Sequence, residues 1–174
     1  MEHSKEFSRP TWDDYFMTVA LAVASRASCV KIKTGAILVK DKRIISTGYN
    51  GHPPGIDSCF VNGGCRKEKK GVKWEEKNTG NCYTVHAEVN ALIQTSGENA
   101  KGATMYSVLF PCADCAKTIA GAGVKEVVYI RYYHEPDSRT QEIFDLAGIK
   151  FRKIDYNAKE VLTMLEQIAT DKFC

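Results

Sequence analysis

Hydrophobic residues recur along the chain at two spacings, and these spacings predict the order of its helices and strands. Over residues 12–25 they recur at helical intervals, and Thr11 with Asp14 resembles the capping pair that begins a helix. Residues 35–40 and 43–48 are rich in β-branched and apolar side chains and are separated by only two residues. A connection this short predicts an antiparallel hairpin.

From residue 86 onwards, helical and strand patterns alternate. The expected helices cover about 86–95, 112–120, 138–147 and 157–172, and the expected strands cover 103–109, 126–131 and 149–154. Helices between strands imply parallel pairing with right-handed crossovers. The pattern therefore predicts an α/β fold: a mixed five-stranded sheet with helices on both faces, in one domain over residues 1–174.

Residues 49–81 show neither period. This segment holds Gly, Pro, Asn and Cys, and a charged run at residues 66–70. A solvated face is the simpler interpretation of that run, and a phosphate-binding patch is the alternative. An irregular segment of this length inside a compact domain is usually functional or held by something else. Residues 52–82, which carry three of the cysteines, are called the insert below.

Composition narrows the class of protein. The 174 residues are 44% hydrophobic and 26% charged, with a net charge of +3, which is too mild to indicate a nucleic-acid partner. Residues 1–10 are polar and lack the apolar centre of a signal peptide. The longest apolar stretch, residues 19–24, is too short to cross a membrane. We expect a soluble, cytoplasmic protein without a membrane or nucleic-acid partner.

Seven cysteines are many for such a chain. Without a secretory signal, a reducing compartment is expected, and clustered thiols there favour a metal over disulfides.

Two short motifs carry the chemistry. His86-Ala87-Glu88 is H-x-E, and Pro111-Cys112 to Cys115 is P-C-x-x-C. Cys112 and Cys115 are three residues apart on a predicted helix, so their thiols face one way. One His and two Cys make three zinc ligands and leave a fourth position open, as in catalytic sites. The alternatives are a closed zinc knot or two unrelated buried thiols.

Glu88, two residues from a metal ligand, is placed for proton transfer. H-x-E with P-C-x-x-C resembles the signature of the zinc-dependent nucleobase deaminases. In that chemistry water attacks C4 of a cytosine ring, and the carboxyl group carries a proton to the ring nitrogen and then to the departing ammonia. Zinc lowers the pKa of a water ligand to about 7.

Further motifs resemble the deoxycytidylate (dCMP) deaminases of the zinc-dependent cytidine/deoxycytidylate deaminase superfamily. They are Ser25-Arg26, Thr34-Gly35-Ala36, Gly48-Tyr49-Asn50-Gly51-x-Pro53, His86-Ala-Glu-x-Asn90-Ala91 and Pro111-Cys-x-x-Cys-Ala-Lys117. The resemblance covers about residues 11–154 and implies the three-layer α/β/α sandwich of that family. It also implies hydrolysis of dCMP to dUMP and ammonia, which supplies dUMP for thymidylate synthesis.

The resemblance implies substrate-binding roles for Arg26, Asn50, Ala87, Tyr132 and Tyr133. Arg26 and Tyr133 match positions expected at the 5′-phosphate, since a guanidinium group can bind phosphate bidentately. Asn50 matches an amide that bonds the sugar hydroxyl. For Tyr132, the neighbour of Tyr133, the alternative to a place at the phosphate is stacking on the base. The simpler alternatives are surface charge for Arg26 and an ordinary turn for Asn50.

The family resemblance also implies regulation and assembly. Relatives are commonly homohexamers activated by dCTP with Mg²⁺ and inhibited by dTTP, and Gly48-Tyr49-Asn50-Gly51 is the matching effector loop. Gln94 and Gly97 depart from the aromatic residue and Arg of some regulated relatives.

Some phage relatives carry a second, structural zinc near positions matching Cys29 and Cys59. Cys65 and Cys82 would complete a Cys₄ site here, and the alternative is four separate apolar fillers. Cys174 is expected in a frayed tail.

Two rival functions remain. A deaminase of tRNA or single-stranded DNA would need a basic groove with aromatic platforms. A non-catalytic zinc-stabilised binding module would not need Glu88.

Overall fold

The computed structural model describes residues 9–76, 79–133 and 137–170. Its centre is a five-stranded sheet in the order β2-β1-β3-β4-β5. The strands are β1 (Gly35–Lys40), β2 (Arg43–Tyr49), β3 (Thr104–Leu109), β4 (Glu126–Arg131) and β5 (Lys150–Lys153). β1 pairs antiparallel with β2 and β3, whereas β3, β4 and β5 are parallel. The predicted mixed sheet is confirmed.

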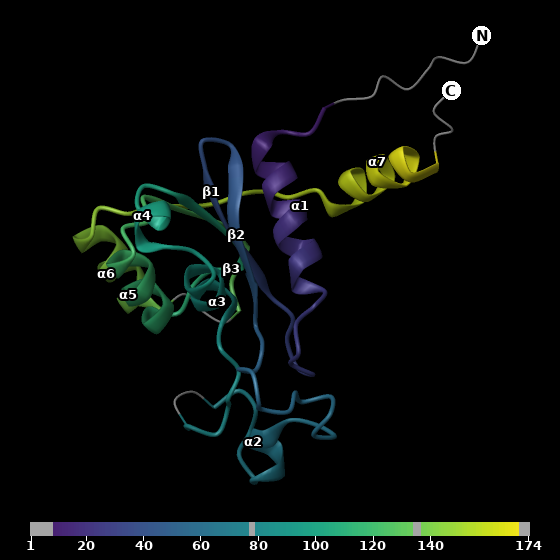
Figure 1. Ribbon diagram of the computed structural model, residues 1–174, viewed down its shortest axis with the longest axis vertical. Coiled ribbons are helices and arrows are strands. Elements are labelled where there is room, and N and C mark those ends of the chain that lie inside the picture. Colours follow the sequence, from purple (N-terminus) through teal and green to yellow (C-terminus); the bar gives the residue numbers. More distant parts are fainter. Residues whose placement is uncertain (1–8, 77–78, 134–136, 171–174) are drawn as a thin grey trace.

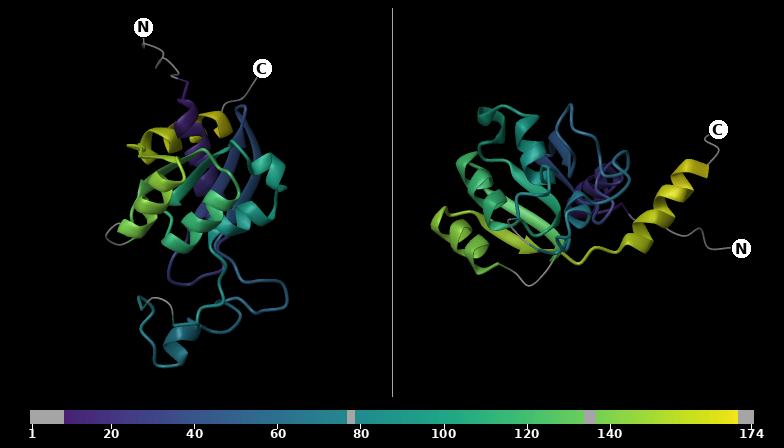
Figure 2. Two further views of the ribbon diagram at one scale, coloured as in Figure 1. Left: turned by 90° about the vertical axis from the view of Figure 1, so that its left-hand side faces the viewer. Right: turned by 90° about the horizontal axis from the view of Figure 1, so that it is seen from below.

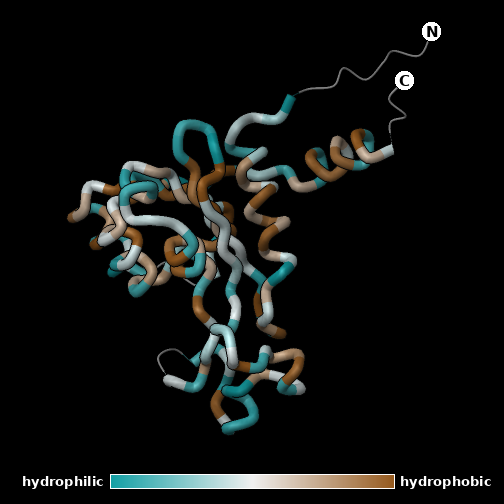
Figure 3. The backbone as a smooth tube through the Cα atoms, viewed as in Figure 1, coloured by the Kyte–Doolittle hydropathy of each residue, from teal (hydrophilic) through white to brown (hydrophobic). Residues whose placement is uncertain are grey.

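The predicted hairpin is also confirmed, with Lys40 paired to Arg43. Its two connecting residues, Asp41 and Lys42, have φ values of 51° and 59°. Positive φ at both positions is the turn geometry that follows the twist of paired strands, and here two non-glycine residues adopt it. Figure 3 shows that this tip of the hairpin is hydrophilic.

Helices cover both faces of the sheet (Figure 1, Figure 2). α1 (Trp12–Ala24) lies on one face, and α3 (Ala87–Ile93), α5 (Ala113–Gly121) and α6 (Ser138–Leu146) lie on the other. Short helices α2 (Arg66–Lys69) and α4 (Gly97–Ala100) were not expected, because four residues are too few to show a period. The other elements agree with the predicted ranges to within two residues where described.

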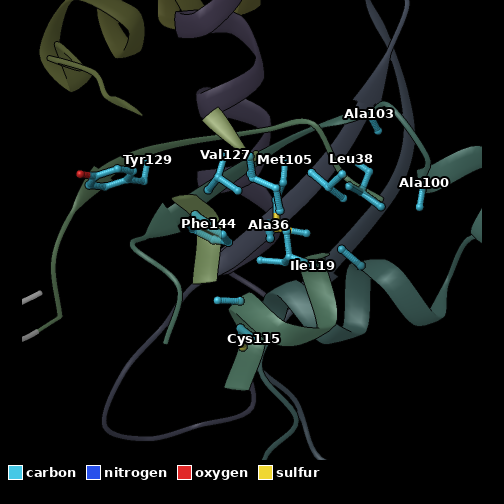
Figure 4. Close-up of a cluster of buried hydrophobic side chains, with 14 of the residues drawn as sticks. Ala36, Leu38, Ala100, Ala103, Met105, Cys115, Ile119, Val127, Tyr129 and Phe144 are labelled. Carbon is cyan, nitrogen blue, oxygen red and sulfur yellow. The ribbon is translucent and has the colours of Figure 1, made fainter. Parts of the chain in front are cut away.

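Two apolar clusters hold these layers together, and alternation along each strand divides them. Ile37 of β1 points towards α1 and belongs to the same cluster as Phe16 and Ala20 of that helix. Leu38, the next residue, belongs to the cluster under α3, α5 and α6, which Figure 4 shows. Since neighbouring strand residues point to opposite faces, an apolar run such as β1 can serve both layers.

α7 (Ala158–Thr170) extends away from the sheet and contacts α1 (Figure 1, Figure 2). The rest of the predicted final helix, residues 171–172, lies outside the described residues, as does Cys174. Among the described residues, no helix has both the length and the apolar character needed to cross a membrane.

Gly48 permits the close approach of β2 and α3 on which the position of α3 depends. A Cβ atom on Gly48 would lie 2.2 Å from the nitrogen of Ala91 and 2.3 Å from the carbonyl oxygen of Ala87. Both are backbone atoms, so relief would require movement of the whole helix. We expect Gly48→Ala to lower the free energy of unfolding by at least about 2 kcal/mol, measured in urea.

Gly97→Ala is the matched control, because a Cβ atom there meets nothing within 4 Å. We expect its effect to stay within about 0.5 kcal/mol. Equal stabilities of the two variants would contradict the tight contact between β2 and α3.

Candidate active site

The N-terminus of α3 presents His86 and Glu88. A single β-bridge between Gly51 and Val85 leads the chain from the insert into this helix, and His86 is its N-cap residue. Asn90 donates a hydrogen bond from Nδ2 to the carbonyl oxygen of Tyr49 at 2.7 Å. The bridge and this hydrogen bond fix the start of α3 against the end of β2.

The N-terminus of α5 presents the two cysteines. Helix α5 follows the carboxyl end of β3, and Cys112 is the N-cap residue of this helix. Thr140 of α6 donates a hydrogen bond to the carbonyl oxygen of Pro111 at 3.2 Å and holds this turn from behind. Cys115 is 1% exposed and belongs to the apolar cluster beneath α5, as Figure 4 shows.

The three predicted metal ligands converge. The Nδ1 atom of His86 lies 3.5 Å from Sγ of Cys112 and 3.3 Å from Sγ of Cys115. Tetrahedral zinc with Zn–N and Zn–S bonds of about 2.05 and 2.3 Å would place N and S about 3.6 Å apart. Within the described residues this is the one group of three or more His, Cys, Asp or Glu ligand atoms lying within 4.8 Å of one another. The donor set and its spacing therefore fit catalytic zinc.

Electrostatics within the triad favour a thiolate. A hydrogen bond from the Cys115 thiol, with another from His86, lowers the pKa of Cys112 to about 4, against the opposing effect of burial. Its partner Cys115 has a raised pKa, because it donates to Cys112 and is buried. The hydrogen bond with Cys112 raises the pKa of His86 to about 9. A cation bound here would replace the positive charge that the imidazole carries.

Glu88 lies beside this triad and is 5% exposed. The Cys115 thiol lies 3.7 Å from Oε2 of Glu88. Burial raises the pKa of the Glu88 carboxyl group, and the charge on His86 opposes that shift. This shift moves the pKa of the carboxyl group towards the range that suits general acid–base catalysis.

A cavity of about 550 Å³ opens in front of these groups, a size suited to a small molecule. It is lined by the triad, Glu88, Phe110, Tyr132 and Tyr133 from the body of the protein and by Trp74, Glu75 and Glu76 from the insert. Thr34 and Thr84 also line it, and their buried hydroxyl groups have no hydrogen-bond partner among the described residues.

The family model of the cytidine and deoxycytidylate deaminase zinc-binding region matches residues 10–131. This range includes the His86, Cys112 and Cys115 triad and Glu88. The chain belongs to the cytidine and deoxycytidylate deaminase family. The family expected from H-x-E and P-C-x-x-C is confirmed.

Individual relatives agree with this assignment. The chain is 36% identical to the deoxycytidylate deaminase of Saccharomyces cerevisiae, over 90% of this chain and 49% of the yeast protein, so it spans about half the length of that relative. Identity to the deoxycytidylate deaminase of Mycobacterium phage D29 is 41%, over 70% of this chain and 96% of the phage protein.

A solved structure confirms the predicted α/β fold. The dCMP deaminase of cyanophage S-TIM5, in complex with dCMP and dUMP, aligns with a TM-score of 0.68 and 30% identity. The alignment covers 84% of this chain and 99% of the phage protein.

The other residues expected to bind substrate in this deaminase-family chain are dispersed. Asn50, Tyr132 and Tyr133 line the cavity, whereas Arg26 and Ala87 are not among the residues that line it. Arg26 is exposed in the turn after α1, and Ala87 is fully buried. The amide of Asn50 accepts from the nitrogen of Thr34 and donates to the carbonyl oxygen of Ile32, both at 3.0 Å. Asn50 therefore shapes the cavity wall as well as facing it.

The predicted effector loop joins β2 to the insert. Gly48 is packed under α3, and Gly51 forms the bridge to Val85. The Tyr49 side chain is 38% exposed. Of this loop, only Asn50 lines the cavity.

The cations of the cavity were not predicted as site residues from the sequence. Four Lys and Arg side chains line the cavity: Lys31, Lys67, Lys117 and Arg139. Three of them, Lys31, Lys117 and Arg139, form ion pairs with Glu68, Asp114 and Asp137 at 2.6, 2.7 and 2.7 Å. Lys117 stands two residues after the last cysteine of the P-C-x-x-C motif, and this position was the available signal for it. For Lys31 and Arg139 the sequence offers no such signal, because only the fold brings their segments to the cavity.

The four further described cysteines are Cys29, Cys59, Cys65 and Cys82. Within the described part of the chain, no three of their sulfur atoms lie within 4.8 Å of one another, unlike the ligand atoms of the triad. Cys29 and Cys65 act electrostatically on Cys59, while Cys82 acts on His86. Sγ of Cys59 lies 3.7 Å from Nε2 of His52, a residue that the sequence did not single out.

Proposed function

We propose that this protein hydrolyses dCMP to dUMP and ammonia. The observation that carries the proposal is the meeting of His86, Cys112 and Cys115 beside the buried carboxyl group of Glu88, at one end of a cavity lined by aromatic rings and hydroxyl groups. The crystallised S-TIM5 relative, which is bound to dCMP and dUMP, supports a pyrimidine mononucleotide as the ligand.

In the proposed reaction three residues bind the metal and a fourth transfers protons. His86, Cys112 and Cys115 would hold zinc, which when bound lowers the pKa of a coordinated water and so supplies a nucleophile at neutral pH. Glu88 accepts a proton from the attacking water and delivers it to N3 of the cytosine ring. As the C4–N bond breaks, the same carboxyl group takes the proton of the new C4 hydroxyl group and gives it to the leaving amino group, which departs as ammonia and leaves a C4 carbonyl group. The raised pKa of Glu88 suits both directions of transfer.

A substrate panel tests this proposal. Deoxycytidine, dCMP, dCTP and a single-stranded oligonucleotide are each assayed for ammonia release, with dCTP and dTTP added in turn as effectors. We expect dCMP to be the preferred substrate. Turnover of the oligonucleotide alone would favour the tRNA or DNA deaminase, and a folded, zinc-loaded protein without any turnover would favour the binding module.

Regulation and assembly form part of the same proposal. We infer activation by dCTP with Mg²⁺ and inhibition by dTTP through the loop from Gly48 to Gly51, in a cytoplasmic homohexamer that supplies dUMP for thymidylate synthesis. The exposed ring of Tyr49, at the outer edge of this loop, is available to stack on a nucleotide base. The effector arms of the panel and the mass in sedimentation equilibrium test these two features.

We infer that Arg26 contributes to selection of the 5′-phosphate. Among the described residues its exposed side chain has no acidic partner of the kind that Lys31, Lys117 and Arg139 have in the cavity. We expect Arg26→Ala to lower kcat/KM for dCMP about tenfold or more while leaving deoxycytidine turnover unchanged. Arg43→Ala, at an exposed position of β2, is the control. If Arg26→Ala keeps the preference for dCMP over deoxycytidine, Arg26 does not select the phosphate, and the cations that line the cavity become the candidates for this role.

We also infer a second, structural zinc near Cys29, Cys59 and Cys65, with Cys82 as the fourth candidate ligand. The contact between His52 and Cys59 makes His52 a further candidate. Such a site would stabilise the insert, which has little apolar core of its own. We expect metal analysis to return two zinc ions per chain, and one for Cys59→Ser with deaminase activity retained. One zinc ion in the unmodified protein would contradict the second site.

A further inference from the structure

Trp74 brings the insert into the active-site cavity. Its half-buried indole lines the cavity together with Tyr133, which follows β4. The two ring centroids are 5.9 Å apart with an interplanar angle of 55°. One aromatic wall of the cavity is therefore built from two segments about sixty residues apart in the chain.

Lys67 holds Trp74 in this position. Lys67 lies on α2 and is 7% exposed, which is unusual for a lysine. Its ammonium group donates to the carbonyl oxygen of Trp74 at 2.7 Å and to that of Glu76. It has no ion pair within the part of the chain that the structure describes. A buried charge that relies on backbone carbonyl groups favours the one backbone conformation that supplies them.

Two further contacts support this turn. Glu76 accepts a hydrogen bond at Oε1 from the nitrogen of Lys73 at 3.0 Å and closes the turn around Trp74. Glu68 of α2 pairs with Lys31 at 2.6 Å and ties the insert to the segment before β1. The indole is thus fixed from its own turn and from the body of the protein.

We propose that Trp74 is a substrate-positioning residue, whose ring contacts the bound pyrimidine nucleotide, and that Lys67 keeps it in place. This proposal rests on the proposed function for the identity of the ligand. Tyr133 supports it, because burial raises the pKa of its hydroxyl group to about 12 and keeps the second ring of the wall neutral. Uncharged aromatic faces suit stacking on a nucleobase.

The chain provides its own probe, because Trp12 and Trp74 are its two tryptophans. Trp12 packs against Tyr15 and Phe16 on α1. In Trp12→Phe only Trp74 fluoresces, and in Trp74→Phe only Trp12 does. We expect titration with dUMP, a ligand that is not turned over, to change the fluorescence of Trp12→Phe saturably and to leave that of Trp74→Phe unchanged.

Kinetics separate positioning from folding. We expect Trp74→Ala to raise KM for dCMP about tenfold, with kcat changed less than about threefold, while Trp74→Phe retains most of the affinity. Lys67→Met should raise KM similarly, and adding it to Trp74→Ala should cause no further rise, because both act on one ring. Zinc content and thermal midpoint identify any variant that merely fails to fold.

Two results would overturn the proposal: fluorescence of Trp74 that does not respond to dUMP or dCMP, or an unchanged KM in Trp74→Ala. These outcomes differ from failure of the proposed function, in which Trp12→Phe and the unmodified protein would both leave dCMP intact. The fluorescence titration requires no turnover, so it decides the role of Trp74 even in that case.

Discussion

Replacing Glu88 with glutamine is expected to lower kcat for dCMP about 100-fold to 10,000-fold while the protein stays folded and zinc-loaded. Glutamine keeps the size and polarity of the side chain but cannot take up or release a proton at neutral pH. Glu88 is 5% exposed, and burial raises its pKa, which suits it to this role. Steady-state ammonia release, measured beside zinc content, checks this result.

The matched control is Glu98→Gln, which makes the same chemical change at an exposed position of α4. Its activity should equal that of the unmodified protein. Retention of more than about a tenth of kcat in Glu88→Gln would show that another group moves the proton, and the mechanism proposed above would then be wrong.

Cys112→Ser is expected to abolish activity by a different route, through loss of zinc. Cys112 is half-buried and only packs against the apolar core, whereas Cys115 is 1% exposed and belongs to it. Serine at position 112 therefore removes a ligand without leaving a cavity, which serine at position 115 would not achieve so cleanly. Activity should fall on the order of 1,000-fold or more, with catalytic zinc absent from the purified protein.

The thermal midpoint should fall together with the zinc content, because a metal that binds only the folded chain stabilises it. Chelator treatment of the unmodified protein should reproduce both losses, and added zinc should restore them. Cys174→Ser is the control for the loss of a thiol as such. Full zinc occupancy and activity in Cys112→Ser would contradict the assignment of this cysteine as a ligand.

Much of the fold follows from local pattern. The hairpin of β1 and β2 was predicted from its two-residue connection, and the helices and strands after residue 86 from hydrophobic spacing and capping residues. Helices α2 and α4 escaped prediction, because each is a single turn whose formation depends on its surroundings.

The catalytic groups were predicted because their geometry is encoded over a few residues. A spacing of three at the start of a helix points the thiols of Cys112 and Cys115 one way, and H-x-E places Glu88 two residues from His86. That His86 lies 3.5 and 3.3 Å from the two sulfur atoms is a separate matter, since it depends on α3 and α5 packing on the same face of the sheet.

By itself the sequence determined the family and the order of the elements, and it singled out the three candidate metal ligands and the candidate proton-transferring carboxyl group. Each of these depends on residues that are neighbours in the chain. Only the tertiary structure decided that Trp74 joins Tyr133 in the cavity wall, that four Lys and Arg side chains line the cavity, and that Arg26 is not among the lining residues. Such placements depend on contacts between distant segments, which are fixed when strands pair and helices pack. No spacing along the chain records them.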